Sequence, residues 1–392
     1  MRTLDNINKF LVEKLGQKAQ PTLLDAFNAL SRAYGGEGKA RSKENALEEL
    51  AIVFVGPAEG VQLKAGPITT SSPKLIGLIS FADLRKYDTS AITNMGSMFN
   101  GCSALTSLDV SNFDTSKVTG MRDMFSNCRA LTSLDLSNFD TSKVTNMSYM
   151  FDECIALTNL NLSNFDTSQV TDMNNMFNGC RALTSVDLSN FDTSAITNMG
   201  YMFNGCSALT SLDVSNFDTK QVTGMGFMFN GCSALTSLDL SNFDTKQVTG
   251  MGFMFSNCIA LTNLNLSNFD TSKVTGMRDM FSNCRALTSL DLSNFDTSKV
   301  TDMNNMFNGC RALTSVKFPG EGKWASNASI KTFDISAAPL DVASIQGLAV
   351  ALATKTSQCT LKLKSASWEA AKAADSTLET TLSAKNWVVT AV

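Results

Sequence analysis

The sequence predicts an α/β solenoid over residues 87–320, a stack of nine coils with a parallel sheet along one side. Three observations predict it. An aromatic residue returns every 26 positions, the unit at 113–138 is identical to the unit at 269–294, and the apolar spacing changes within each unit. The recurring aromatic residues are Tyr87, Phe113, Phe139, Phe165, Phe191, Phe217, Phe243, Phe269 and Phe295. One coil cannot bury its own apolar face, so the coils must cover one another.

The second half of each unit predicts a short strand. In the unit at 113–138, Leu134 and Leu136 flank Asp135, and this alternation turns the leucines inward and the carboxylate outward. Coils stacked in register would pair these strands in parallel at a spacing of about 4.8 Å.

The first half of the unit changes to a spacing of three or four. Val118, Met121, Met124 and Cys128 follow this spacing, which favours a helical or 3₁₀ arc pressed onto the neighbouring coils. Asp114 precedes the arc, where its carboxylate can act as a helix N-cap. The predicted coil is therefore strand, turn, short helical arc and turn.

The repeated pattern FDTSxVTxMxxMFxxCxALTSLDLSN resembles the 26-residue bacterial surface-protein repeat of the BspA-like leucine-rich-repeat proteins. The resemblance covers 87–320 and recurs in all nine units. It implies a right-handed, leucine-rich-repeat-like solenoid and a role in surface display, attachment or partner binding. The resemblance brings no catalytic residues with it.

The ends of the chain differ from the repeats. Amphipathic spacing predicts a small helical anchoring domain at 1–56, followed by a linker and cap strand at 57–86. After the repeats, 321–392 is expected to form capping coils, in which Phe333 and Ile335 restore the strand pattern with Asp334 outward. A helix at 341–354, a strand at 359–363, a helix at 367–383 and a last strand at 387–390 are expected there.

Cysteine and methionine also recur as ladders. Nine of the ten cysteines take one position per coil, from Cys102 to Cys310, and eighteen of the nineteen methionines take two. Equivalent positions on stacked coils point the same way, which disfavours disulfides. We therefore expect buried thiols and thioethers that fill the core. A disulfide or soft-metal ladder is the alternative for the cysteines.

The candidate partner-binding site is the outward column on the strands, expected on the concave face. It consists of Asp109, Asp135, Asn161, Asp187, Asp213, Asp239, Asn265 and Asp291. Like charges about 5 Å apart repel unless solvent or a partner relieves them. The column is therefore either a solvated face or a binding surface for a basic or polyhydroxylated partner, with or without divalent cations. The Asn112-to-Asn294 series is expected to bond turn backbone groups instead.

Composition excludes several function classes. The chain has no histidine, no phosphate-binding glycine motif and no paired-cysteine metal motif, so no enzyme activity, metal site or cofactor is expected. Its net charge of −4 gives no reason to expect a nucleic-acid partner. No apolar run is long enough to predict a membrane span. The first residues do not resemble a signal peptide, because Asp5 and Asn6 lie where its apolar region would begin.

These observations favour a non-enzymatic attachment or display protein. Its repeats would bind a protein or glycan on a host or cell surface, and its N-terminal helices would dock on a larger assembly or form a homo-oligomer. A bacteriophage virion component, such as a tail or capsid appendage, is one hypothesis, and a bacterial cell-surface adhesin or interaction module is the alternative.

Overall fold

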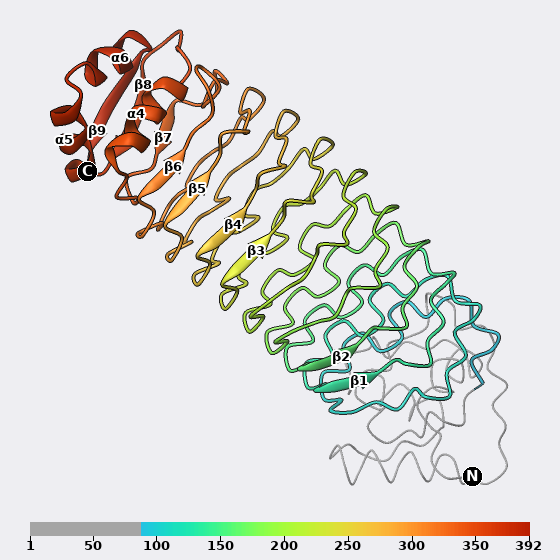
Figure 1. Cartoon of the computed structure of the whole chain (residues 1–392). Helices are drawn as coiled ribbons and strands as arrows, with labels where there is room; N and C mark the ends of the chain where they lie inside the picture. Colours follow the sequence, from blue (N-terminus) through green and yellow to red (C-terminus); the bar gives the residue numbers. More distant parts are fainter. Residues whose placement is uncertain (1–87) are drawn as a thin grey trace, which may run out of the picture.

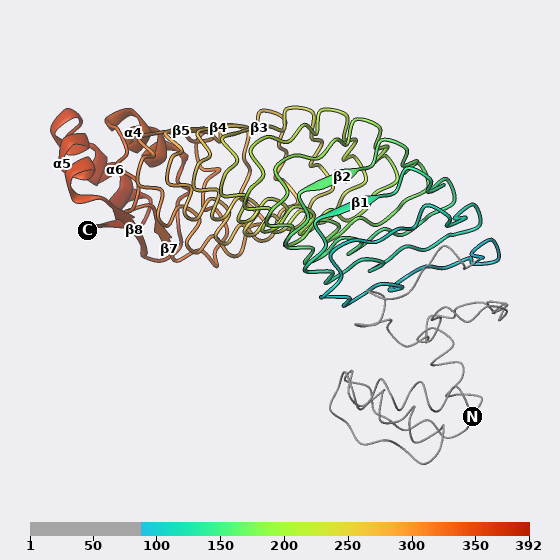
Figure 2. The same cartoon turned by 90° about the horizontal axis from the view of Figure 1, so that it is seen from below.

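A computed structural model describes residues 88–392, which form one elongated stack of coils closed by a compact C-terminal cap (Figure 1). The expected helical domain at 1–56 and the linker and cap strand at 57–86 lie outside the described residues. We number the coils one to nine, so that coil one ends at residue 112 and each later coil adds 26 residues. The stack bends along its length (Figure 2). The chain is a leucine-rich-repeat-like solenoid.

The strand side of the stack carries six three-residue strands. They are β1 (Ser133–Asp135), β2 (Asn159–Asn161), β3 (Ser237–Asp239), β4 (Asn263–Asn265), β5 (Ser289–Asp291) and β6 (Ser315–Lys317). They pair in parallel only as β1–β2, β3–β4 and β5–β6. In each pair a residue lies opposite the one 26 positions later in the sequence. The predicted parallel pairing in register is confirmed, but the sheet is divided into three pairs of strands, since coils one, four and five have no strand. A three-residue strand offers few ladder bonds, so a small offset between coils removes the pairing.

The other side of each coil is the arc, residues 94–102 of coil one and their equivalents. The arc is not a helix, because these residues form consecutive tight turns. Alternate amides nevertheless make the i→i+3 bond of the 3₁₀ alternative, such as that from Asn204 to the Tyr201 carbonyl at 3.1 Å. In coil five the amides of Met199, Tyr201, Phe203 and Gly205 donate to carbonyls of coil six over 2.7–3.1 Å. An amide that would bond within a helix is bonded between coils instead. Each arc also holds two residues of positive φ, such as Tyr201 at 60° and Gly205 at 72°.

The arcs form the continuous ladder of the solenoid. Bridges link every pair of neighbouring arcs from Asn94 in coil one to Asp302 in coil nine. Across each interface three or four arc amides donate in the same direction, toward the next coil. This ladder replaces the expected sheet as the unbroken connection between coils.

The core lies between the two sides and contains the predicted ladders. Inner arc phenylalanines stack from Phe99 to Phe307, with successive ring centroids 5.5–5.9 Å apart. All ten cysteines are buried and none forms a disulfide. Thiols such as that of Cys128 donate to a carbonyl of the preceding coil, here Phe99 at 3.1 Å. The methionines are buried from coil two onward. The prediction of core-filling thiols and thioethers is confirmed.

The C-terminal cap contains β7 (Thr332–Asp334), α4 (Val342–Ala351), β8 (Cys359–Leu363), α5 (Ser365–Ala374), α6 (Leu378–Ala384) and β9 (Trp387–Ala391). The helix expected at 367–383 is divided into α5 and α6, because the chain turns at 375–377. The start of α4 closes the strand side. The amide of Val316 donates to Ser344 Oγ at 2.8 Å, and that of Asp341 donates to the Thr314 carbonyl at 2.7 Å.

The cap does not continue the strand column. Strand β7 pairs with β8 in a separate parallel sheet of order β7–β8–β9, not with β6. Phe333 instead packs edge-on against Phe307 of the last arc, with centroids 6.1 Å apart. The expected strand pattern is confirmed, because Phe333 and Ile335 are buried and Asp334 between them is partly exposed, but this strand belongs to the sheet of the cap.

Candidate partner-binding face

The candidate face is built by the strand position that turns away from the core. In β1 the central Leu134 is buried, while Ser133 and Asp135 on either side are exposed. In the other coils the central residue is buried or half-buried, and the candidate residue follows it on the opposite side, so the eight candidate residues share one side of the stack. Seven of them are exposed and Asn265 is half-buried. The structure thus places them together, and their binding role stays a prediction.

Each of these side chains also closes a turn at the end of its strand. The Oδ1 atom of Asp213 accepts the backbone N–H of Ser215 at 2.9 Å, and Asn161 accepts that of Ser163 at 3.0 Å. This Asx turn fixes the side chain in one orientation. Hydrogen bonds from the backbone and side chain of Ser215 lower the pKa of Asp213 from its ordinary value. The carboxylates of the column are therefore ionised at neutral pH.

The charge along the column is uneven. Asp187, Asp213 and Asp239 lie in consecutive coils and form its longest uninterrupted acidic run. Asn265 ends this run by donating to Asp239 Oδ1 at 3.0 Å. Lys317 ends the column by pairing with Asp291 at 3.1 Å, although both side chains are more than half exposed. The middle coils carry the strongest negative field on this face.

Two other polar columns serve the chain itself. Asp114 Oδ1 accepts the backbone N–H of Ser116 at 2.9 Å, so this series caps a turn and not the helix that we expected. Asn138 Nδ2 donates to the carbonyls of Val110 and Phe113 at 3.0 and 2.9 Å. The predicted amide ladder that satisfies turn carbonyls is confirmed.

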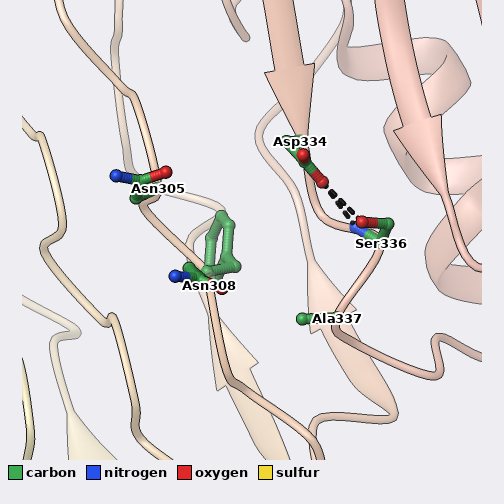
Figure 3. A pocket seen from close by; sticks show the side chains of 6 residues that line it. Asn305, Asn308, Asp334, Ser336 and Ala337 are labelled. Atoms are coloured by element: carbon green, nitrogen blue, oxygen red, sulfur yellow. Dashed lines mark hydrogen bonds between the residues drawn. The ribbon is translucent and has the colours of Figure 1, made fainter.

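A small polar cavity lies where the last arc meets the cap (Figure 3). Its volume is about 130 Å³, and its lining residues are Asn305, Phe307, Asn308, Asp334, Ser336 and Ala337. Ser336 donates its backbone N–H and its hydroxyl to Asp334 Oδ1, and Lys362 pairs with Oδ2 at 3.3 Å. The charged group of this cavity is thus already engaged within the chain. Within residues 88–392 no three acidic or cysteine side chains are grouped to hold a metal ion.

Comparison with protein families identifies the repeats. One family model, described as a Mycoplasma protein of unknown function, DUF285, matches residues 76–185, 154–262 and 232–335. Together these stretches cover more than half of the 392 residues. The chain belongs to the DUF285 family. No curated protein matches the chain.

Solved structures resemble this DUF285 chain only distantly. A leucine-rich cell surface protein from Faecalibacterium prausnitzii is 16% identical, with a TM-score of 0.24. The match covers 65% of this chain and 79% of that protein. An internalin from Listeria monocytogenes is 12% identical, with coverages of 74% and 78% and a TM-score of 0.21. The TLR13–ssRNA13 complex is 17% identical, with coverages of 69% and 45% and a TM-score of 0.22.

One feature of the DUF285 chain was missed by sequence reasoning. Three aromatic side chains on the outer surface of the arcs, Tyr201, Phe227 and Phe253, stack directly on one another. The signal was present, because the units are nearly identical and this position varies among them. The variation suggested no surface until the arc conformation showed that the position faces outward.

Among described helices, none is long and apolar enough to cross a membrane.

Proposed function

We propose that this DUF285 protein is a non-enzymatic attachment or display protein whose strand face binds a partner on a host or cell surface. The observation that carries the proposal is the column of outward, ionised carboxylates held by Asx turns, with the uninterrupted run of Asp187, Asp213 and Asp239 at its centre. The repeated carboxylates lie in columns and do not converge on one point, as the acid and base of an active site would.

The column suits a partner that supplies positive charge or many hydroxyl groups. Each Asx turn engages Oδ1, which leaves Oδ2 of residues such as Asp187 and Asp213 directed to solvent. A row of Lys or Arg side chains would relieve the repulsion between neighbouring carboxylates and form charge-assisted hydrogen bonds. A polyhydroxylated glycan would use the same oxygens as acceptors, and added divalent cations distinguish a cation-bridged glycan from a basic protein.

The direct test replaces the acidic run with the amide that the chain itself uses in coils three and seven. The variant D187N/D213N/D239N keeps each Asx-turn acceptor and removes three charges. We expect binding to host cells to weaken by about tenfold or more, and the remaining binding to lose its salt dependence. The control is D140N/D166N/D192N, which removes three equivalent charges from the other Asx column. Unchanged binding by the strand-face variant would contradict the proposal.

We place this protein in a bacteriophage virion, as a tail or capsid appendage mounted through its N-terminal region. The ten buried thiols, none of them in a disulfide, support this placement, because virion proteins assemble in a reducing cytoplasm where such thiols persist. Mass spectrometry of purified virions and of bacterial fractions tests it. Recovery of the chain only with the bacterial cell surface would favour an adhesin instead. Light scattering of the full chain would show whether it forms a homo-oligomer.

A further inference from the structure

We infer that the outer arc surface of coils five to seven is a second interaction site, which takes a protein segment with an apolar centre and acidic residues at both ends. These coils lie in the middle of the stack (Figure 1). The site is on the arcs and not on the strands, so it does not depend on the proposed role of the carboxylate column.

The site is centred on a stack of three aromatic rings. The ring of Phe227 lies between those of Tyr201 and Phe253, with both centroid distances at 4.4 Å and interplanar angles of 7° and 10°. Tyr201 is 38% exposed, and Ile259, on the arc side of coil seven, is 43% exposed. These two are the exposed large apolar side chains of the described repeats, so the apolar surface is concentrated in these coils.

The aromatic residues occupy a backbone conformation that disfavours them. Tyr201, Phe227 and Phe253 all have φ of 59–60°, a left-handed value that is rare for bulky side chains. Coils four and nine place Asn175 and Asn305 at the same position, a residue type that adopts this conformation readily. Stacking of the rings offsets part of the cost, but rings were not needed to build the arc. Strain of this kind is concentrated at functional positions.

The surroundings of the stack are uncharged. The arcs and following turns at 198–211, 224–237 and 250–263 contain no Asp, Glu, Lys or Arg, whereas coils four and eight do. On one flank the Arg181 side chain is 65% exposed while its partner Glu153, at 4.0 Å, is 25% exposed. On the other flank the Arg278 side chain is 54% exposed while its partner Asp279 is only 12% exposed. The accessible charge on both flanks is therefore positive. An apolar centre within a charged rim is the usual arrangement of a protein interface.

The stacking geometry favours a protein over a glycan. Sugars stack on ring faces, but both faces of Phe227 are covered by its neighbours, which leaves the ring edges to a partner. Ring edges carry partial positive charge and favour carbonyl oxygens and other aromatic rings. The amides of Asn204 and Asn230, three residues after the rings, are bonded to each other, so they are engaged within the chain. The basic flanks then favour acidic residues at both ends of the segment.

The test uses the full chain and a phage-displayed library of random peptides. The variant Y201N/F227N/F253N carries the residue of coils four and nine at each position, so we expect it to fold. The control is Y149N, because Tyr149 occupies the same position outside the stack, beside Arg122. Peptides selected on the natural chain should have apolar centres and acidic ends. They should bind the triple variant at least about tenfold more weakly and the control unchanged.

Selected peptides that bind the triple variant as tightly as the natural chain, or a failure to select any, would overturn the inference. Two other results would also overturn it. They are binding of the natural chain to an array of neutral oligosaccharides, and a dimer of the natural chain seen by light scattering, if either is lost in the triple variant. If the triple variant does not fold, the variant R181E/R285E decides the question, because Arg285 is exposed and occupies in coil eight the position that Arg181 occupies in coil four. This variant should bind peptides with acidic ends more weakly and peptides with basic ends more tightly than the natural chain does. Equal binding of both kinds of peptide would refute the site. The variant D187N/D213N/D239N should bind the peptides normally, which separates this site from the strand face.

Discussion

The arc side and the strand side of the coils differ in how they are bonded and in what they expose to solvent. The arcs are linked without a break from Asn94 to Asp302, whereas the strands pair only in three separate pieces. The arcs also supply the buried Phe, Met and Cys ladders, while the strand side presents ionised carboxylates to solvent. The comparison indicates that the arcs hold the stack together. The strand side is then free to carry like charges that a structural ladder would not tolerate.

Alkaline pH should unfold the solenoid by ionising the buried thiols of the arcs. Burial raises the pKa of the Cys206 thiol from its ordinary 9.0 to about 12, and that of Cys154 likewise. The folded pKa lies above the unfolded one, so this stabilisation is fully present below pH 9.0 and is lost as pH rises toward 12. We expect cooperative unfolding in that window, with thiolate absorbance appearing together with the loss of circular dichroism. Thiolate absorbance near pH 9 in a folded chain would show that the thiols are accessible.

A single cavity in the arc ladder should have the next largest effect. Phe203 stacks between Phe177 and Phe229 at 5.5 and 5.9 Å and is fully buried. Phe203→Ala should lower the free energy of unfolding by about 3–5 kcal/mol, as measured by urea denaturation. Asp213→Ala, on the strand side of the same coil, should cost about 1 kcal/mol through loss of its Asx turn. Equal losses would mean that the arcs are not the dominant connection.

The turn leading into the arc should show an intermediate effect. The hydroxyl of the buried Thr193 donates to the Asp218 carbonyl at 3.0 Å and accepts the Asp218 amide at 2.8 Å. Thr193→Val removes both bonds and should lower the free energy of unfolding by about 2 kcal/mol. Thr197→Val is the matched control, because its hydroxyl is exposed and donates to Thr171 at 3.4 Å. A control loss as large as that of the variant would refute the assignment.

The smallest effect is expected on the strand face. Asp213→Asn keeps the Oδ1 acceptor for Ser215 and removes one charge from the acidic run. The free energy of unfolding should change by less than about 0.5 kcal/mol, with a small gain at low salt from reduced repulsion. Urea denaturation at low and high salt measures this change. A loss above about 1 kcal/mol would show that this column is structural, which would weaken the binding proposal.

The candidate face illustrates how far sequence reasoning reaches. The alternation around Asp135 is a local signal, and it correctly predicted an exposed carboxylate beside two buried leucines. The same alternation in coil five, around Asp213, did not produce a strand, because pairing depends on the offset between neighbouring coils. The pattern of Phe333 and Ile335 correctly predicted the strand β7, but its pairing with β8 and not with β6 had no signal in the sequence.

The sequence by itself determined the period, the buried ladders and the outward column, since a 26-residue repeat places the same side chain at the same point of every coil. The tertiary structure decided the arc conformation. A spacing such as Met121, Met124 and Cys128 fits a helix and a series of turns equally well. The turns form because they let backbone amides of the arc donate hydrogen bonds to the next coil. It also decided that Tyr201, Phe227 and Phe253 meet as one surface, because residues 26 apart become neighbours only when the coils stack.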